Sequence, residues 1–320
     1  MSAPDIVEAI PLLPRRRLVG SAFGGHTSVR RGSGIDVAGS RPYRPGDHFH
    51  AIDWKASARL SSARGTDEFI VRDRFAEEMP RTVIVCDRRP EMALFPPGLP
   101  WLRKPEAVEW AALILVTSAV NERGLVGYLD YASHGEPSQP RLPFWRPPRA
   151  QASAWGGNLT ELTRTFLDGG FDAPADNVQR SLELLSSSSG SVPAGSFIFV
   201  LSDFLVETPL EYWTEATERG WDVVPVVVQD PLWERSFPPI GGVTAPFSDA
   251  TGGRLVMVRL TEREAAQRRQ ANEARFAALL RDFADAGLDP VLVWDSSHEG
   301  VRRAFLSWAD LRFGVVGRRT

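Results

Sequence analysis

The chain has 320 residues, of which 43% are hydrophobic and 24% are charged, as is usual for a folded globular protein and not for a disordered one. The formal net charge of −3 at pH 7 gives no electrostatic reason to expect a nucleic acid as partner. A single cysteine, Cys86, excludes a disulfide within the chain and predicts a reducing compartment, the cytoplasm. No segment has the pattern of a signal peptide or a transmembrane helix, so we expect membrane association only through a partner.

Residues 1–80 are rich in glycine, arginine, serine and proline. They contain only short strand-like pieces, such as residues 68–71, and they lack the hydrophobic period of a helical bundle. We therefore expect an irregular, partly β N-terminal arm over residues 1–80, followed by a second domain over residues 81–320.

Strand and helix patterns alternate throughout this second domain. Short apolar runs predict buried strands at residues 81–86, 125–131, 196–202, 223–228 and 290–294. Helices are predicted at residues 105–122, 159–167, 176–185, 209–219, 262–286 and 301–311. A proline-rich region at about 134–155 predicts a surface excursion, and residues 249–253 predict a hairpin turn. Because parallel strands need crossover connections, the alternation predicts an α/β fold with a doubly wound, mostly parallel sheet.

Two of the predicted strands end in an aspartate, Asp87 and Asp203. Ligands of doubly wound sheets bind at the carboxyl ends of the strands, near the point where the strand order reverses, so these carboxylates are placed to bind a cation. Alternatively, each aspartate caps the turn that follows its strand. The sequence contains no phosphate-binding loop, dinucleotide fingerprint, nucleophile elbow or His-Glu-x-x-His pair, which favours a binding protein over an enzyme.

Arginines, carboxylates and aromatic residues are concentrated between residues 41 and 59. The residues of interest are Arg41, Tyr43, Gly46, Asp47, Asp53, Trp54 and Arg59. We expect Asp47 and Asp53 to accept charge-assisted hydrogen bonds from neighbouring arginines. We also expect Tyr43 and Trp54 to be buried. Such a network either fixes the arm in place or binds a partner.

The same stretch resembles the signature of the bacterial family called domain of unknown function 58. That signature reads Arg-x-Tyr-x-x-Gly-Asp, a short gap, Ile-Asp-Trp and then Ala-Arg. The matching residues are Arg41, Tyr43, Gly46, Asp47, Ile52, Asp53, Trp54, Ala58 and Arg59. The resemblance covers about residues 15–318 and implies a von Willebrand factor type A-like domain that works with a AAA+ ATPase of the MoxR type.

The resemblance also implies a metal-ion-dependent adhesion site, in which an Asp-x-Ser-x-Ser loop, a threonine and a second aspartate bind magnesium. Asp87 matches the first aspartate and Asp203 the last, whereas Arg89 and Glu91 stand at the serine positions. Asp176 is the nearest oxygen-bearing substitute for the threonine. Two arrangements are possible. Arg89 bridges the two aspartates in place of the metal, or it turns outward while Glu91 and Asp176 rebuild a magnesium site.

Our leading hypothesis is a non-catalytic interaction or assembly module with a degenerate adhesion site, no bound cofactor and a MoxR-type ATPase as partner. The alternative is a divalent-metal-dependent hydrolase that uses Asp87, Glu91, Asp176 and Asp203. Binding of anions or nucleic acid by the arginines at positions 15–17, 30 and 31 is a third hypothesis and ranks last.

Overall fold

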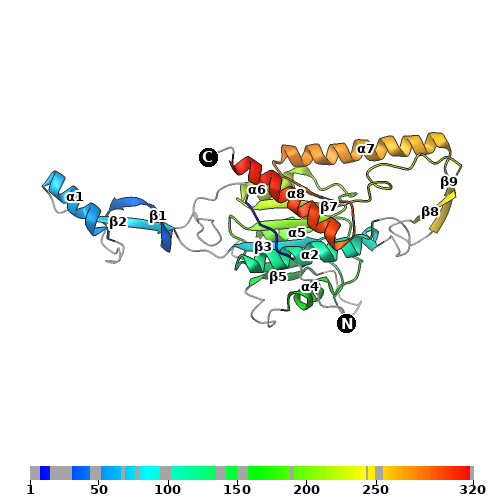
Figure 1. Cartoon of the computed structure of the whole chain (residues 1–320). Coiled ribbons are helices and arrows are strands. Elements are labelled where there is room, and N and C mark those ends of the chain that lie inside the picture. Colours follow the sequence, from blue (N-terminus) through cyan, green and yellow to red (C-terminus); the bar gives the residue numbers. More distant parts are fainter. Residues whose placement is uncertain are drawn as a thin grey trace. The chain divides into compact units, whose positions relative to one another are not determined.

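The computed structural model describes residues 8–14, 31–43, 52–65, 69–75, 80–93, 102–134, 142–149, 158–187, 191–242, 244–248 and 255–317. The chain divides into two compact units (Figure 1). We call Met1–Arg15 together with Arg81–Thr320 the α/β body, and Arg16–Pro80 the N-terminal unit.

The α/β body is built on a central sheet with the strand order β10-β7-β6-β3-β4-β5 in the described residues. The strands are β3 (Arg81–Cys86), β4 (Leu125–Asp130), β5 (Phe144–Arg149), β6 (Phe197–Ser202), β7 (Asp222–Val228) and β10 (Val291–Val293). All pair in parallel except β5, which pairs antiparallel with β4 at the edge of the sheet. Part of the proline-rich region that was predicted as a surface excursion therefore forms the edge strand β5. Prolines are tolerated there because an edge strand need not donate on its outer side.

Helices cover both faces of this sheet. One hydrophobic core joins it to α2 (Lys104–Asn121), α4 (Leu159–Leu167) and α8 (His298–Gly317). A second core joins the other face to α5 (Asn177–Ser187), α6 (Leu210–Glu218) and α7 (Glu262–Asp285). Along β3, Ile84 and Cys86 belong to the first core and Val83 and Val85 to the second, as the alternation of side chains in a strand requires. The chain thus has the predicted doubly wound, mostly parallel α/β fold.

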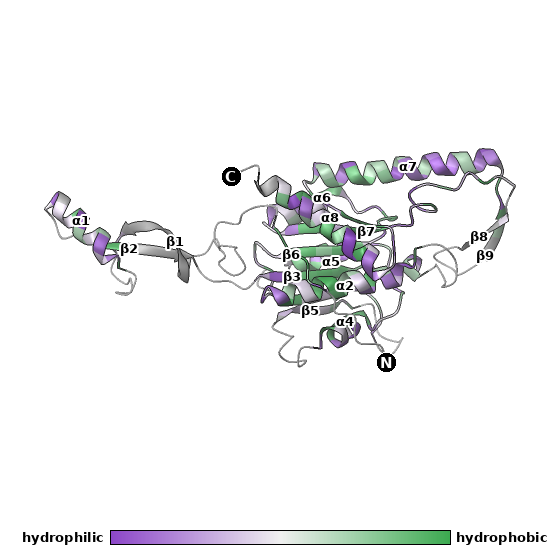
Figure 2. Ribbon diagram, in the orientation of Figure 1, coloured by the Kyte–Doolittle hydropathy of each residue, from purple (hydrophilic) through white to green (hydrophobic). Residues whose placement is uncertain are grey.

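The burial of individual elements follows their composition. Strand β6, Phe-Ile-Phe-Val-Leu-Ser, is buried at every position because helices cover both faces of the sheet. Helix α2 is apolar and buried around most of its circumference. Helix α7 begins with a capping box formed by Thr261 and Glu264 and exposes most of its polar side chains. Figure 2 shows this contrast, with hydrophobic residues concentrated in the sheet and α2 and mixed colours along α7.

A short N-terminal segment also belongs to the α/β body. Ile10 and Leu12 are each 2% exposed and lie in the same core as α2. The backbone N–H of Ile10 donates to Ser118 Oγ over 2.9 Å, and that of Leu12 donates to Glu122 Oε1 over 3.0 Å. The predicted arm of residues 1–80 therefore begins too early. Two alternating apolar residues are too short a pattern to identify a core segment from sequence.

The N-terminal unit contains β1 (Arg31–Pro42), α1 (Trp54–Arg64) and β2 (Ile70–Phe75), with β1 and β2 antiparallel and irregular in register. In the α/β body, a separate hairpin of β8 (Thr244–Ser248) and β9 (Leu255–Arg259) leads into the start of α7, as Figure 1 shows. Within the described residues, no helix combines the length and hydrophobicity needed to cross a membrane.

Candidate functional site

The candidate site lies where the strand order of the sheet reverses. From β3 the chain continues to β4 on one side, and β6, β7 and β10 lie on the other. Asp87 follows β3 and Asp203 follows β6, and these two strands are hydrogen-bonded neighbours. Both aspartates are fully buried. The two strand-terminal carboxylates predicted from the sequence are therefore adjacent, at the position where doubly wound proteins bind ligands.

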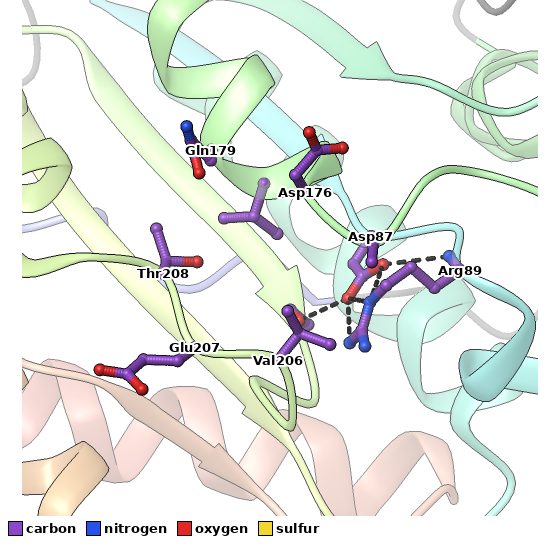
Figure 3. A pocket seen from close by; sticks show the side chains of 10 residues that line it. Asp87, Arg89, Asp176, Gln179, Val206, Glu207 and Thr208 are labelled. Carbon is purple, nitrogen blue, oxygen red and sulfur yellow. Dashed lines mark hydrogen bonds and ion pairs between the residues drawn. The ribbon is translucent and has the colours of Figure 1, made fainter.

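Arg89 bridges these two carboxylates. Its Nη2 atom lies 2.7 Å from Asp87 Oδ2 and 2.5 Å from Asp203 Oδ1, and its side chain is 2% exposed. The Nε atom of Arg89 also donates to Asp87 Oδ2 over 2.9 Å (Figure 3). Of the two arrangements predicted for Arg89, the structure has the bridging one.

A second cation, Lys104, extends this arrangement. Its Nζ atom lies 2.7 Å from Asp203 Oδ2 and 2.5 Å from Glu234 Oε1, and Lys104 is fully buried at the start of α2. Asp87, Arg89, Asp203, Lys104 and Glu234 thus form a row of alternating charges, which we call the buried charge chain. Sequence analysis missed Lys104, although it is one of only two lysines and immediately precedes a proline at a predicted helix start.

The pKa shifts show which groups this arrangement holds ionised. Burial would raise the pKa of Asp203, but Lys104 and Arg89 outweigh that effect and lower it. Burial likewise opposes the charge of Lys104, yet Asp203 and Glu234 raise its pKa overall. Glu234 differs, because burial and the charge of Asp203 together raise its pKa despite the contact with Lys104. Glu234 is therefore more easily neutralised than Asp203.

Hydrogen bonds complete the environment of the aspartates. Asp87 Oδ1 accepts from Asn177 Nδ2 over 2.9 Å, and Asp87 Oδ2 accepts from Ser202 Oγ over 2.6 Å. Asn177, which sequence analysis did not single out, stands close to the position where the resemblance places a threonine. Asp87 and Asp203 also accept from the backbone N–H of Arg89 and Leu205, respectively. The capping interpretation and the ion-pair interpretation of these aspartates therefore both apply.

Glu91 and Asp176 do not join this centre. Asp176 is 46% exposed and pairs with Arg180, whose Nε lies 2.8 Å from Asp176 Oδ1. Glu91 lies in the short 3-10 helix η2 (Pro90–Ala93), and its Oε2 atom is buried without a hydrogen-bond partner among the described residues. In the described part of the chain, no three His, Cys, Asp or Glu side chains are grouped so that they could hold a metal ion. The four carboxylates of the hydrolase hypothesis are thus not assembled into one site.

Aspartates also stand at the ends of two other parallel strands, β4 and β7. Asp130 ends β4 and accepts hydrogen bonds from Tyr128, from the Ala132 N–H and from His134. Asp230 follows β7 and accepts from the N–H of Leu102 and Leu232. These carboxylates fix the loops at the carboxyl edge of the sheet, and the sequence would have revealed them if every strand end had been compared.

A cavity of about 120 Å³ opens beside the buried charge chain. Its walls include Asp87, Arg89, Asp176, Gln179, Val206 and Thr208, all of which are labelled in Figure 3. The cavity therefore lies between the loop after β3, the start of α5 and the loop after β6.

The signature residues of the N-terminal unit are only partly described. Asp53 caps α1, because its Oδ1 atom accepts from the Ala56 N–H over 3.1 Å. Trp54 and Tyr43 make edge contacts with Phe69, but Trp54 is 60% exposed, so its predicted burial is wrong. A unit this small has too little interior to enclose a tryptophan at the start of its helix.

The remaining signature residues give less information. Arg59 is exposed. Gly46, Asp47 and the side chain of Arg41 lie outside the described residues, as do the side chains of the arginines at positions 15–17, 30 and 31. The predicted network of arginines around Asp47 therefore stays a prediction.

Fold and site together define a doubly wound α/β protein in which buried ion pairs occupy the crevice at the strand ends. Residues 39–278 match the family model described as "Protein of unknown function DUF58". The chain belongs to this family, which confirms the resemblance drawn from residues 41–59. No curated protein matches the chain at a significant level.

Three solved structures illustrate what the chain is similar to. The conserved hypothetical protein BatB from Bacteroides thetaiotaomicron is 16% identical, with a TM-score of 0.38, over 72% of this chain and 99% of BatB. An aerotolerance-related membrane protein from Bacteroides fragilis is 16% identical, with a TM-score of 0.33, over 64% and 99% of the two chains. The pilus adhesin SpaC from Lactobacillus rhamnosus is 14% identical, with a TM-score of 0.29, over 68% of this chain and 25% of SpaC.

Proposed function

We propose that the chain is a non-catalytic interaction module, a von Willebrand factor type A-like domain with a degenerate metal site, which binds a AAA+ ATPase of the MoxR type. The observation that supports this most directly is the position of Arg89 between Asp87 and Asp203. The surface that binds the partner is the carboxyl edge of the sheet. Because such an ATPase consumes ATP, the proposed complex forms in the cytoplasm.

The charges at this edge support a site that functions without a metal ion. A guanidinium group stays protonated in proteins, so Arg89 keeps a fixed positive charge where a cation would bind. Asp87 and Asp203 already accept several hydrogen bonds each and have little capacity left for coordination. A divalent ion would have to displace Arg89 and leave its charge without a partner, which is unfavourable.

The exposed residues that follow the strands at the carboxyl edge of the sheet support docking of a protein. Val206 and Leu210, after β6, are 38% and 42% exposed, and Leu232, after β7, is 48% exposed. Trp294, after β10, is 52% exposed and lies near the guanidinium of Arg235. Exposed apolar and aromatic side chains beside charged groups are typical of protein interfaces.

Co-purification tests this proposal. We expect the full chain to retain a MoxR-type ATPase from the same genome, with or without a non-hydrolysable ATP analogue. The Val206→Glu variant should weaken retention, because it places a charge among the apolar residues of the docking surface. The Leu311→Glu variant is the matched control, since Leu311 is 74% exposed on α8, away from the carboxyl edge. Failure of the ATPase to associate in any nucleotide state would refute the proposal.

A further inference from the structure

Two large aromatic side chains lie next to each other on the surface of the N-terminal unit. Trp54, the first residue of α1, is 60% exposed, and Phe69, which immediately precedes β2, is 44% exposed. Their ring centroids are 5.9 Å apart, and the ring of Tyr43 lies 6.4 Å from that of Phe69. An exposed apolar patch beside charged groups typically marks a surface that binds a protein or a membrane. The function proposed above leaves this surface unused.

Two basic side chains stand beside these rings. Lys55 and Arg59 are both exposed, and neither forms an ion pair within the described residues. They are one helical turn apart on α1, so their like charges repel each other. Helix α1 contains no acidic residue that would balance them. A surface that carries negative charge would therefore be a favourable partner for Lys55 and Arg59.

The exposed residues of α1 occupy one side of the helix. At about 100° per residue, they fall within an arc of about 140°. They are Trp54, Lys55, Ala58, Arg59 and Ser62. Ser57, on the opposite side, is buried and donates to the Asp53 carbonyl over 2.7 Å. We call the exposed side, together with Phe69, the α1 face. It combines exposed aromatic rings and unpaired positive charges on one surface.

We propose that the α1 face binds the surface of a bilayer that contains anionic phospholipids. Trp54 and Phe69 enter the interfacial region, where aromatic rings are favoured. Lys55 and Arg59 contact the lipid phosphate groups. Such a contact lies on the membrane and needs no helix that crosses it. It is a direct contact, in place of the association through a partner that we expected from the sequence.

The arrangement of the rings argues against a nucleic acid, because single strands stack their bases on open aromatic faces. The planes of Trp54 and Phe69 differ by 81° and those of Tyr43 and Phe69 by 75°, so the rings meet edge to face. They do not form a row of parallel faces on which successive bases could stack.

The size of the α1 face argues against a protein partner. A specific protein complex buries about 800 Å² on each partner, more than the exposed parts of two aromatic and two basic side chains offer. Membrane binding has no such minimum, because it grows with each apolar side chain inserted and each basic side chain near the surface.

The inference goes beyond the proposed function and is testable on the full chain without the ATPase. The probes are vesicles of phosphatidylcholine alone and vesicles that also contain phosphatidylglycerol, which we call mixed vesicles. The readout is the fraction of protein that sediments with the vesicles as lipid is added. We expect the mixed vesicles to bind at least about tenfold more tightly, and about 0.5 M salt to remove most of that difference.

Variants of the α1 face sharpen the test. Trp54→Ala removes the most exposed ring and should lower the affinity for mixed vesicles about fivefold. The double variant Lys55→Glu/Arg59→Glu should lower it at least about tenfold and abolish the preference for mixed vesicles. All three side chains are exposed, so these changes should leave the fold intact, which circular dichroism checks.

Matched controls lie on α8 in the other unit. Phe313→Ala removes an aromatic side chain that is 68% exposed, and Arg303→Glu reverses a charge on a side chain that is 72% exposed. Both should bind mixed vesicles as the wild type does, because neither residue belongs to the α1 face.

The outcomes are distinct from those of the co-purification experiment. No sedimentation with mixed vesicles, equal binding of the two vesicle types, or binding that the variants of the α1 face leave intact would overturn the inference. Tighter binding of a single-stranded oligonucleotide than of mixed vesicles would overturn it as well and would assign the α1 face to a nucleic acid. Vesicle binding and retention of the ATPase are measured separately, so the failure of one proposal leaves the other standing.

Discussion

Lys104 Nζ lies 2.7 Å from Asp203 Oδ2, so a fully buried ion pair joins the start of α2 to the end of β6. The same Lys104 lies 2.5 Å from Glu234 in the loop after β7. One lysine therefore connects three segments that are far apart in the sequence. The interior can hold these charges only because each has a partner of opposite sign.

Replacing this lysine should strongly destabilise the α/β body. Lys104→Met leaves the buried carboxylate of Glu234 without its cation and Asp203 with Arg89 alone, so we expect a loss of about 3–5 kcal/mol in the free energy of unfolding. Urea denaturation followed by circular dichroism measures it. Lys55→Met is the control, because Lys55 is exposed and its loss should change stability by less than about 0.5 kcal/mol. Equal effects of the two substitutions would contradict the buried charge chain.

Arg89 should determine the response of the protein to magnesium. The Arg89→Ser variant loses the bridge between Asp87 and Asp203, and we expect it to be about 3–5 kcal/mol less stable than the wild type. About 10 mM Mg²⁺ should restore part of that loss in a thermal-shift assay, because a ligand that binds only the folded state stabilises it. The wild type should not respond.

The control for this experiment is Arg180→Ser. Arg180 is 44% exposed and pairs with Asp176 at the surface, so its loss should have little effect and create no response to Mg²⁺. A wild-type melting temperature that rises with Mg²⁺ as much as that of Arg89→Ser would show that a metal site is retained.

Glu234 should give the protein a characteristic pH dependence. Burial raises the pKa of Glu234, so the folded chain binds a proton there more readily than the unfolded chain does. The stability that Glu234 contributes therefore increases as the pH falls through its raised pKa in the folded chain toward its pKa in the unfolded chain. As the pH is lowered from neutral toward the pKa of the unfolded chain, the wild type should gain stability relative to Glu234→Gln in urea denaturation. A difference that does not change with pH would contradict the raised pKa.

Cys86 should be chemically inert in the native protein. It is fully buried, and burial raises its pKa to about 12, so it carries almost no thiolate near neutral pH. A thiol reagent should therefore react only after denaturant unfolds the chain. Rapid stoichiometric labelling under native conditions would show that β3 is more open than the structure indicates.

The N-terminal segment should contribute to the stability of the α/β body. Ile10 is 2% exposed within the core, and Ile10→Ala should reduce the free energy of unfolding by about 2–4 kcal/mol. Leu311→Ala, at a position 74% exposed on α8, should change it by less than about 0.5 kcal/mol. If Ile10→Ala has no effect, residues 8–14 do not pack in solution as the structure has them.

Sequence patterns predicted most of the fold because its elements are locally encoded. Residues 196–202 and 262–286 are predicted as a strand and a helix, and the structure has β6 at Phe197–Ser202 and α7 at Glu262–Asp285. The edge strand β5 was not predicted, since its prolines are typical of loops and only its pairing with β4 makes it a strand. Trp54 was expected to be buried only because tryptophan is a large aromatic residue. Residue type alone does not show whether the unit that contains it has an interior large enough to bury it.

The candidate site was predictable only in part. Asp87 and Asp203 are identified by their positions after apolar runs, and Arg89 by its place at a serine position of the metal-binding motif that the family resemblance implies. Lys104 and Glu234 are not identifiable in this way, because Lys104 meets Asp203 across 99 residues and meets Glu234 only through the folded loop after β7. Contacts of that range depend on topology and leave no local pattern.

The position of residues 8–14 in the α/β body also affects how the chain folds during its synthesis. The Ile10 N–H bonds to Ser118, 108 positions away, and the Leu13 carbonyl accepts from Arg312, 299 positions away. A ribosome synthesises residues 8–14 before α8, so this segment cannot complete its contacts until α8 has been made. Contacts of such long range form slowly, and the apolar surface of α2 that Ile10 covers stays open to chaperones or to aggregation until then.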